Sequence, residues 1–154
     1  MDEQRHRAAL WFRELRDRIT AAFEALEDRA PGDAPAGRFE VTPTERADNG
    51  GGGIMSVMRN PHAPAVHMNT RMFWTPGAWW FGGGSDLNPC IEYADDTAHF
   101  HNTLRDACLP HGADYYDHFK AWADEYFFIP HRGRARGVGG IFYDHLEGFF
   151  DANL

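Results

Sequence analysis

The sequence has only two cysteines, Cys90 and Cys108, which lie far apart and form no Cys-x-x-Cys pair. This number and spacing exclude a disulfide framework and a cysteine-rich zinc site. They are typical of a protein in a reducing compartment. We therefore expect a cytoplasmic location.

Long apolar runs and excess positive charge are also missing. No run of about 18 apolar residues occurs, and the amino terminus is charged, which argues against a membrane span or an export signal. The net charge of the 154 residues is −8, whereas binding to nucleic acid or acidic lipid needs a basic surface. We therefore expect neither a nucleic acid nor a membrane as a partner.

Lysine is almost absent, because Lys120 is the only one and 14 of the 15 basic residues are arginines. Genome base composition alone can produce this bias. Arginine nevertheless binds carboxylates through two parallel hydrogen bonds. The local position of each arginine therefore decides whether it has a role in binding.

Apolar residues are plentiful, at 43% of the chain, which is enough for one globular core and one domain over 1–154. Apolar residues spaced three and four apart predict helices over 3–30, 93–109 and 115–128. Apolar runs and alternation predict strands at 38–42, 54–58, 66–74, 78–81 and 141–143. This mixture indicates an α+β domain with an antiparallel or mixed sheet.

The strand predicted at 66–74 carries a row of polar side chains. Because alternate residues of a strand share a face, His67, Asn69 and Arg71 lie together, opposite an apolar face. An imidazole, an amide and a guanidinium in a row suit the recognition of a carboxylate beside a proton-transfer group. The ordinary solvated face of a half-buried sheet is the alternative, and the pattern alone favours neither.

Two glycine runs punctuate the chain. Gly50–Gly53 is interpreted as a flexible turn. Gly82–Gly84 follows three aromatic residues and precedes Asp86, so a large flat ligand could approach the bare backbone there. On residue type alone, the better interpretation is a strand that ends in a turn, with Asp86 hydrogen-bonded to the loop.

The histidines offer only weak metal-site patterns. Helical spacing turns His101 inward and His99 outward, so the two cannot chelate one ion on a regular helix. No His-Glu-x-x-His motif occurs, whereas His145 and Glu147 could supply two of the three ligands of a non-haem iron oxygenase. The basic segment 131–137 is interpreted as a solvated loop.

Several segments together resemble the oxygen-dependent coproporphyrinogen III oxidase family. The matching segments are RNPHAPAVHMNTR at 59–71, WWFGGGSDLNP at 79–89, AHFH at 98–101, DEYFF at 124–128, HRG at 131–133 and RGVGGIFYD at 136–144. The likeness covers about residues 50–146, preceded by the helix within 1–30. It implies an incomplete α+β domain in which helices flank an antiparallel sheet.

The resemblance also implies a function. Members of the family carry out the aerobic oxidative decarboxylation of two propionates of coproporphyrinogen III to vinyl groups, which gives protoporphyrinogen IX in haem biosynthesis. O2 is the co-substrate, and no organic cofactor takes part. The family further implies a homodimer.

Site residues follow from the matching positions. His67 matches the family's proton donor, and Arg71 matches the arginine that binds a propionate. Asn69 and Thr70 stand beside that arginine as further substrate-binding residues. Asp86 matches the acid that contacts the pyrrole N–H groups.

A metal site is implied less directly. His101 and His131 match two histidines that bind a divalent cation in some members of the family. The reaction does not generally need a metal. We therefore expect O2 chemistry without an obligatory metal ion.

The chain departs from the family pattern on both sides of the likeness. Residues 50–58 lack the several dozen residues that follow in relatives, and Gly53 and Val57 replace a substrate-contacting serine and a further histidine. The chain also stops at Leu154, short of its relatives, and we expect the tail after His145 to differ from them. The alternative function is therefore a truncated, non-catalytic remnant that binds tetrapyrroles.

Overall fold

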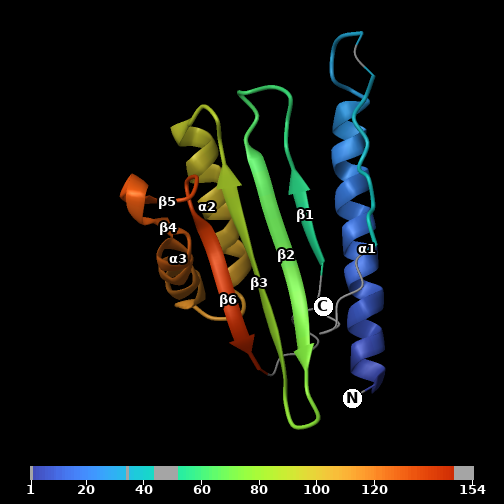
Figure 1. The fold of residues 1–154 in the computed structure, drawn as a ribbon, viewed down its shortest axis with the longest axis vertical. Helices are drawn as coiled ribbons and strands as arrows, with labels where there is room; N and C mark the ends of the chain where they lie inside the picture. Colours follow the sequence, from blue (N-terminus) through green and yellow to red (C-terminus); the bar gives the residue numbers. More distant parts are fainter. Residues whose placement is uncertain (1, 34, 44–51, 148–154) are drawn as a thin grey trace. The chain divides into compact units, whose positions relative to one another are not determined.

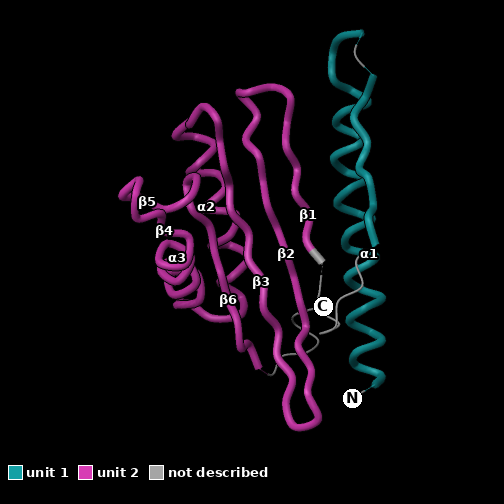
Figure 2. Tube along the Cα trace, viewed as in Figure 1, with its two compact units in different colours: residues 1–50, 154 teal, residues 51–153 magenta. Residues whose placement is uncertain are grey.

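The structure is a computed structural model that describes residues 2–33, 35–43 and 52–147. The chain divides into two compact units, within residues 1–50 and 51–153, and each is described by itself (Figure 2). Within the described ranges, none of the helices combines the length and the apolar character needed to cross a membrane.

The first unit is built on helix α1, Asp2–Glu27, which confirms the helix predicted over 3–30. Apolar residues recur along it every three or four positions, with arginine and glutamate between them. Asp2 and Glu3 lie in the first turn, where acidic side chains favour the helix dipole. The helix ends ahead of Pro31, which cannot continue the hydrogen-bond ladder.

The segment after α1 is extended but is not a strand, so the strand predicted at 38–42 is wrong. The main-chain N–H of Phe39 donates to the Glu24 carboxylate of α1 at 2.9 Å. The Phe39 ring meets the Phe23 ring edge-on, with 6.0 Å between centroids. Helix side chains therefore take the place that a neighbouring strand would occupy.

The second unit contains a four-stranded antiparallel sheet in the order β1-β2-β3-β6 (Figure 1). The strands are β1 (Gly52–Ser56), β2 (Ala65–Trp74), β3 (Trp79–Asn88) and β6 (Gly140–Leu146). Strands β2 and β3 form a long hairpin that pairs continuously from Ala65–Asn88 to Trp74–Trp79. The α+β class with an antiparallel sheet is confirmed.

Helices α2 (Ala94–Cys108) and α3 (Tyr115–Tyr126) pack against β6 and confirm the helices predicted over 93–109 and 115–128. Their buried residues join Ile141 and Tyr143 of β6 in one apolar cluster; these helix residues are Cys108, Tyr116 and Phe119. The helices thereby cover one face of the sheet.

The segment between α3 and β6 is more ordered than the solvated loop expected at 131–137. Strands β4 (Phe128–Ile129) and β5 (Arg134–Ala135) form a small hairpin around the 3-10 turn η1 (Pro130–Arg132). Gly133 closes this turn with φ of 63°, a left-handed conformation that favours glycine. Arg136 follows directly and continues toward β6.

Both glycine runs lie within strands where the structure describes them, and the predicted turns are wrong there. Gly52 and Gly53 begin β1, whereas Gly50 and Gly51 lie outside the described residues. Gly82–Gly84 lies inside β3, between β2 and β6. A Cβ on Gly83 would stand 2.7 Å from the Asn69 carbonyl oxygen and 2.7 Å from the Tyr143 hydroxyl. The neighbouring strands therefore approach so closely that β3 has no room for a side chain at this position.

The two faces of the sheet differ in chemistry. Thr70 and Tyr143 point to the face covered by helices, where their side chains are hydrogen-bonded to each other. The opposite face carries polar side chains from three strands. We call this the polar face, and it consists of His67, Asn69 and Arg71 of β2, Asp86 of β3 and Asp144 of β6.

Candidate active site

Strand pairing assembles the polar face. His67 stands opposite Asp86, and Arg71 stands opposite Gly82, in the register of β2 with β3. The shared face predicted for His67, Asn69 and Arg71 is thereby confirmed, because alternate residues of a regular strand point the same way. The face holds two ion-paired groups, one around Asp86 and one around Arg71.

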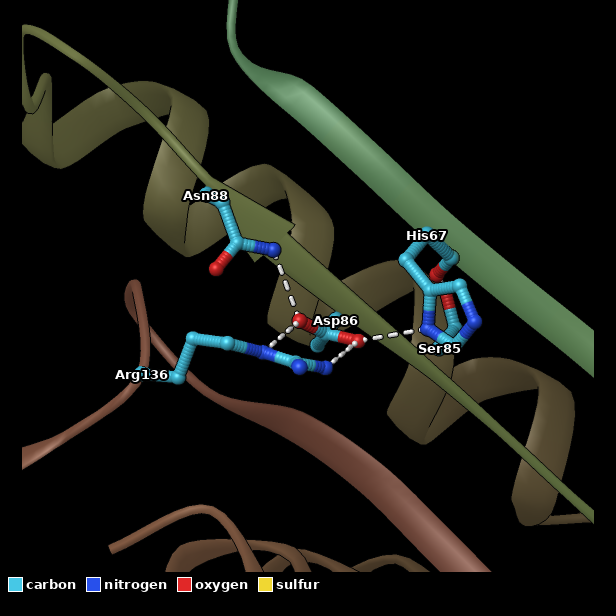
Figure 3. A network of polar contacts seen from close by, with 5 residues as sticks. All are labelled: His67, Ser85, Asp86, Asn88 and Arg136. Carbon is cyan, nitrogen blue, oxygen red and sulfur yellow. Dashed lines mark hydrogen bonds and ion pairs between the residues drawn. The ribbon is translucent and has the colours of Figure 1, made fainter. Parts of the chain in front are cut away.

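The first group surrounds the Asp86 carboxylate, which is only 1% exposed (Figure 3). Arg136 donates to it through Nε at 2.9 Å and through Nη2 at 2.8 Å. Asn88 donates through Nδ2 at 2.6 Å, and His67 Nδ1 lies 2.9 Å from Oδ1. Figure 3 shows the carboxylate held between Arg136 and His67.

The charge of Asp86 follows from these partners. Burial raises the pKa of its carboxyl, but hydrogen bonds from Arg136, Asn88 and His67 outweigh this effect and lower the pKa below its ordinary value. An ionised carboxylate can only accept hydrogen bonds, so the proton of the shared bond lies on His67 Nδ1. This leaves His67 Nε2 as the atom that can exchange a proton with a ligand.

The Asp86 carboxylate is also saturated. A carboxylate offers about four acceptor sites, and four donor atoms occupy them here. A pyrrole N–H group could reach Asp86 only by displacing one of these donors. Asp86 therefore acts on its surroundings through His67 and Arg136.

The second group surrounds Asp144. Arg71 Nη2 donates to its Oδ2 at 3.2 Å, and Trp80 Nε1 donates to Oδ1 at 3.1 Å. The main-chain N–H of His145 adds a third bond at 2.9 Å. Arg71 is 27% exposed, and its buried Nε has no hydrogen-bond partner in the described part of the chain. Arg71 therefore keeps donor capacity beyond its ion pair.

Asn69 lies between the two groups along β2. Its buried Oδ1 accepts no hydrogen bond from any described residue. His67 and Arg71 are four residues apart, or about 14 Å at about 3.4 Å per residue. The strand therefore carries a proton-transfer atom and a cation, with a buried amide oxygen that lacks a donor between them.

Thr70 does not share a face with His67, Asn69 and Arg71. Its side chain is hydrogen-bonded to Tyr143 on the face covered by helices. The alternation of side chains along β2 separates it from Asn69 and Arg71. A ligand on the polar face therefore cannot contact the Thr70 hydroxyl.

The residues expected at a metal site do not come together. His101 points inward, as predicted, but its Nε2 lies 2.9 Å from the Val138 carbonyl oxygen and its Nδ1 lies 2.9 Å from the Tyr116 hydroxyl. His131 is exposed in η1. No group of three or more His, Cys, Asp or Glu side chains among the described residues is placed to hold a metal ion. The arrangement does not fit a metal, and we derive no step through one.

The hypothesis of a non-haem iron site at His145 and Glu147 finds no geometric support either. The His145 ring stacks on Trp80, with 5.0 Å between ring centroids. His145 has φ of 53°, and the pairing of β6 with β3 shifts register nearby. The described residues supply no cluster of three ligands that would include this pair.

Sequence reasoning missed three members of the polar groups: Arg136, Trp80 and Asp144. Arg136 belongs to the segment that the sequence predicts as a solvated loop, yet it donates two hydrogen bonds to the Asp86 carboxylate. Asp144 was visible only as part of the family likeness. No local signal identifies Asp144, because the strand predicted at 141–143 ends before it and its partner Arg71 lies 73 positions away.

Comparison with known proteins identifies relatives. The family model described as Coproporphyrinogen III oxidase matches residues 54–153. The match continues past His145, so the expectation that the tail differs from the family is wrong.

Individual relatives agree with the family match. The oxygen-dependent coproporphyrinogen-III oxidase, mitochondrial, of Homo sapiens is 52% identical over 102 residues, which cover 62% of this chain and 22% of that protein. The proteins of the same name from Rattus norvegicus and Mus musculus are 52% and 51% identical over 102 residues, which cover 62% of this chain and 23% of each relative. The chain thus spans less than a quarter of the length of these relatives. Because the family model matches well over half of its 154 residues, this chain belongs to the coproporphyrinogen III oxidase family.

Proposed function

We propose that the polar face is part of the active site of an oxygen-dependent coproporphyrinogen III oxidase. The reaction is the oxidative decarboxylation of two propionates of coproporphyrinogen III to vinyl groups, which gives protoporphyrinogen IX for haem synthesis. The observation that carries the proposal is the placement of an Asp86-oriented His67 and a partly exposed Arg71 on one face of one strand.

The chemistry sets two tasks for the protein. Each propionate loses CO2, two electrons and one proton when it becomes a vinyl group, and O2 accepts the electrons. The protein must therefore fix a carboxylate and move a proton, and it needs no organic cofactor for either task. Arg71 and His67 are proposed for these two tasks.

Arg71 is proposed to hold the propionate. Its single bond to Asp144 is 3.2 Å long, so the guanidinium fork is not used as a pair of short bonds. A substrate carboxylate can bind the remaining N–H groups while Asp144 keeps the guanidinium in place. Arg71 also lies over the Phe73 and Phe142 rings, 5.5 Å from each centroid, which restricts where the charge can move.

His67 is proposed to move the proton at Nε2. Asp86 fixes the ring by accepting from Nδ1, and the side chain stays 25% exposed. Nε2 lies on the side of β1, because a Cβ on Gly53 would stand 3.8 Å from it. A proton-transfer group with one fixed tautomer is prepared for transfer at its other nitrogen.

Asn69 is proposed to accept a pyrrole N–H hydrogen bond. Its Oδ1 is buried and has no partner in the described ranges, whereas every acceptor site of Asp86 is filled. Because Oδ1 is buried, a tetrapyrrole would supply the missing donor only by turning the Asn69 amide toward the polar face. In this arrangement Asp86 orients His67 and holds Arg136 instead of contacting the pyrroles directly.

The proposal is tested by measuring binding and turnover separately. Coproporphyrinogen III should quench tryptophan fluorescence saturably, and incubation with O2 should give protoporphyrin fluorescence after oxidation of the product. Arg71→Ala should weaken binding about tenfold or more, because a hydrogen bond to a charged group contributes about 1.5–3 kcal/mol. Arg134→Ala removes an exposed arginine from β5 and should bind normally. Equal affinity of the two variants would contradict the role of Arg71.

Saturable quenching without any product would instead support the non-catalytic, tetrapyrrole-binding alternative. Turnover in the presence of a chelator should be unchanged, since no metal step is proposed. The homodimer and the cytoplasmic location expected from the sequence also stay predictions. Sedimentation velocity tests the first, and fractionation of cells that express a tagged chain tests the second.

A further inference from the structure

We propose that His101 and Tyr116 are positioning residues that hold the loop carrying Arg136 against Asp86. The consequence for catalysis rests on the proposed function of the polar face. The hydrogen bonds that connect His101 to Arg136 through the loop exist without any substrate.

The link begins with the His101 ring, which lies between two hydrogen-bond partners. The Val138 carbonyl oxygen, 2.9 Å from Nε2, can only accept, so Nε2 carries the ring proton. Nδ1 therefore accepts from the Tyr116 hydroxyl, 2.9 Å away. Tyr116 is only 3% exposed, and its burial keeps this hydroxyl in a fixed position. The tautomer and the orientation of His101 are thus both determined.

The link continues through the loop at 136–140. Val138 N–H donates to the Leu87 carbonyl at 3.0 Å, and Leu87 N–H donates to the Gly139 carbonyl at 3.2 Å. The Val138 peptide is therefore held by β3 through its own N–H and by α2 through its carbonyl. Leu87 is the neighbour of Asp86, so the loop is fixed beside the carboxylate that Arg136 binds.

Glycine makes this close approach possible at one position in particular. Gly137 has φ of 56°, and a Cβ there would stand 2.1 Å from the Leu87 carbonyl oxygen. The loop backbone therefore lies directly on the end of β3. A small rotation of this backbone would move the base of the Arg136 side chain.

Arg136 depends on this support because its own side chain is 43% exposed. A long, partly exposed side chain loses conformational freedom when it forms a two-point fork, and a fixed backbone reduces that cost. His101 thus acts on Asp86 through Val138 and Arg136, and it needs no metal to do so.

The test follows the titration of the Asp86 carboxyl by carbon NMR in the intact chain. Among the described residues, the charged and titratable groups that face Asp86 are His67 from β2 and Arg136 from the loop before β6. Arg136→Ala should raise the titration midpoint, because it removes a favourable cation. Tyr116→Phe removes only one hydroxyl and should raise the midpoint by a smaller amount.

A double-mutant cycle identifies the route of the effect. If Tyr116 acts through Arg136, Tyr116→Phe should cause no further shift in the Arg136→Ala background. Tyr126→Phe is the matched control, because this tyrosine lies on the same helix and is 63% exposed. It should leave the Asp86 midpoint unchanged.

Two variants of His101 test whether a hydrogen-bond donor at this position is enough to hold the loop. His101→Gln keeps an N–H donor for the Val138 carbonyl and should shift the midpoint less than His101→Ala does. The proposal is overturned if Tyr116→Phe has no effect, or has its full effect without Arg136. The readout needs no substrate. A chain that fails to turn over would therefore refute the proposed function and leave this inference standing.

Discussion

Adding one methyl group at Gly82 should damage the Arg71 group without breaking the sheet. A Cβ there would lie 2.7 Å from Arg71 Nε and 2.7 Å from Asp144 Oδ1, whereas ordinary contacts begin at 3.4 Å. Each of the two distances must therefore increase by about 0.7 Å to reach an ordinary contact. Asp144 cannot move freely, because Trp80 and the His145 main chain also bond to it.

Two opposing effects set the size of the change. Overpacking of a well-packed site costs about 1–3 kcal/mol. Replacement of glycine by alanine reduces the entropy of the unfolded chain, which stabilises the fold by about 0.4–1 kcal/mol. Overpacking is the larger effect, so Gly82→Ala should lower the free energy of unfolding by about 1–2 kcal/mol.

Urea unfolding followed by tryptophan fluorescence measures this change. Gly77→Ala is the matched control, because a Cβ at Gly77 meets no atom within 4 Å. It should be neutral or stabilising by up to about 1 kcal/mol. Gly82→Ala should also weaken the binding of coproporphyrinogen III, which Gly77→Ala should not. If the two variants unfold at the same urea concentration and bind equally, the reasoning about Gly82 is wrong.

Three further variants test other parts of the fold. The lowered pKa of Asp86 stabilises the protein above its unfolded-state pKa of about 3.9, and this contribution is lost as the pH falls through the lower folded-state pKa. Asp86→Asn should therefore reduce stability at neutral pH and remove that part of the acid dependence, as urea midpoints across pH would reveal. Gly140→Ala should cost about 3 kcal/mol or more, because its Cβ would stand 1.9 Å from the Ser85 carbonyl oxygen, and thermal unfolding would detect the loss. Asp144→Ala should weaken substrate binding by releasing Arg71, whereas unchanged affinity would show that the guanidinium needs no partner.

Local periodicity predicted the three long helices, parts of the four main strands and one face of the site. The alternation along β2 placed His67, Asn69 and Arg71 together, since a strand with one apolar face has only one register that buries it. The three main helices were predicted because their apolar residues recur every three or four positions. These features depend only on residues close together in the sequence.

Pairing between distant segments could not be predicted in the same way. Gly82–Gly84 has the composition of a turn, and only its position between β2 and β6 makes it a strand. Arg136 and Asp144 join the site through tertiary contacts that no local pattern encodes. The segment at 38–42 has strand-like residues, but its Phe39 N–H bonds to a helix side chain, and it pairs with no strand among the described residues.

The two ion pairs of the polar face also have a consequence for the order of folding. The β2–β3 hairpin closes through a turn of a few residues, whereas Arg136 lies 50 positions from Asp86 and Asp144 lies 73 positions from Arg71. Contacts between distant residues form more slowly than local ones. We therefore expect the hairpin to form first and the ionic partners to arrive only when β6 docks. Assembly of the proposed binding site would then mark the end of folding. In a refolding experiment, fluorescence quenching by coproporphyrinogen III should therefore develop later than the hairpin forms.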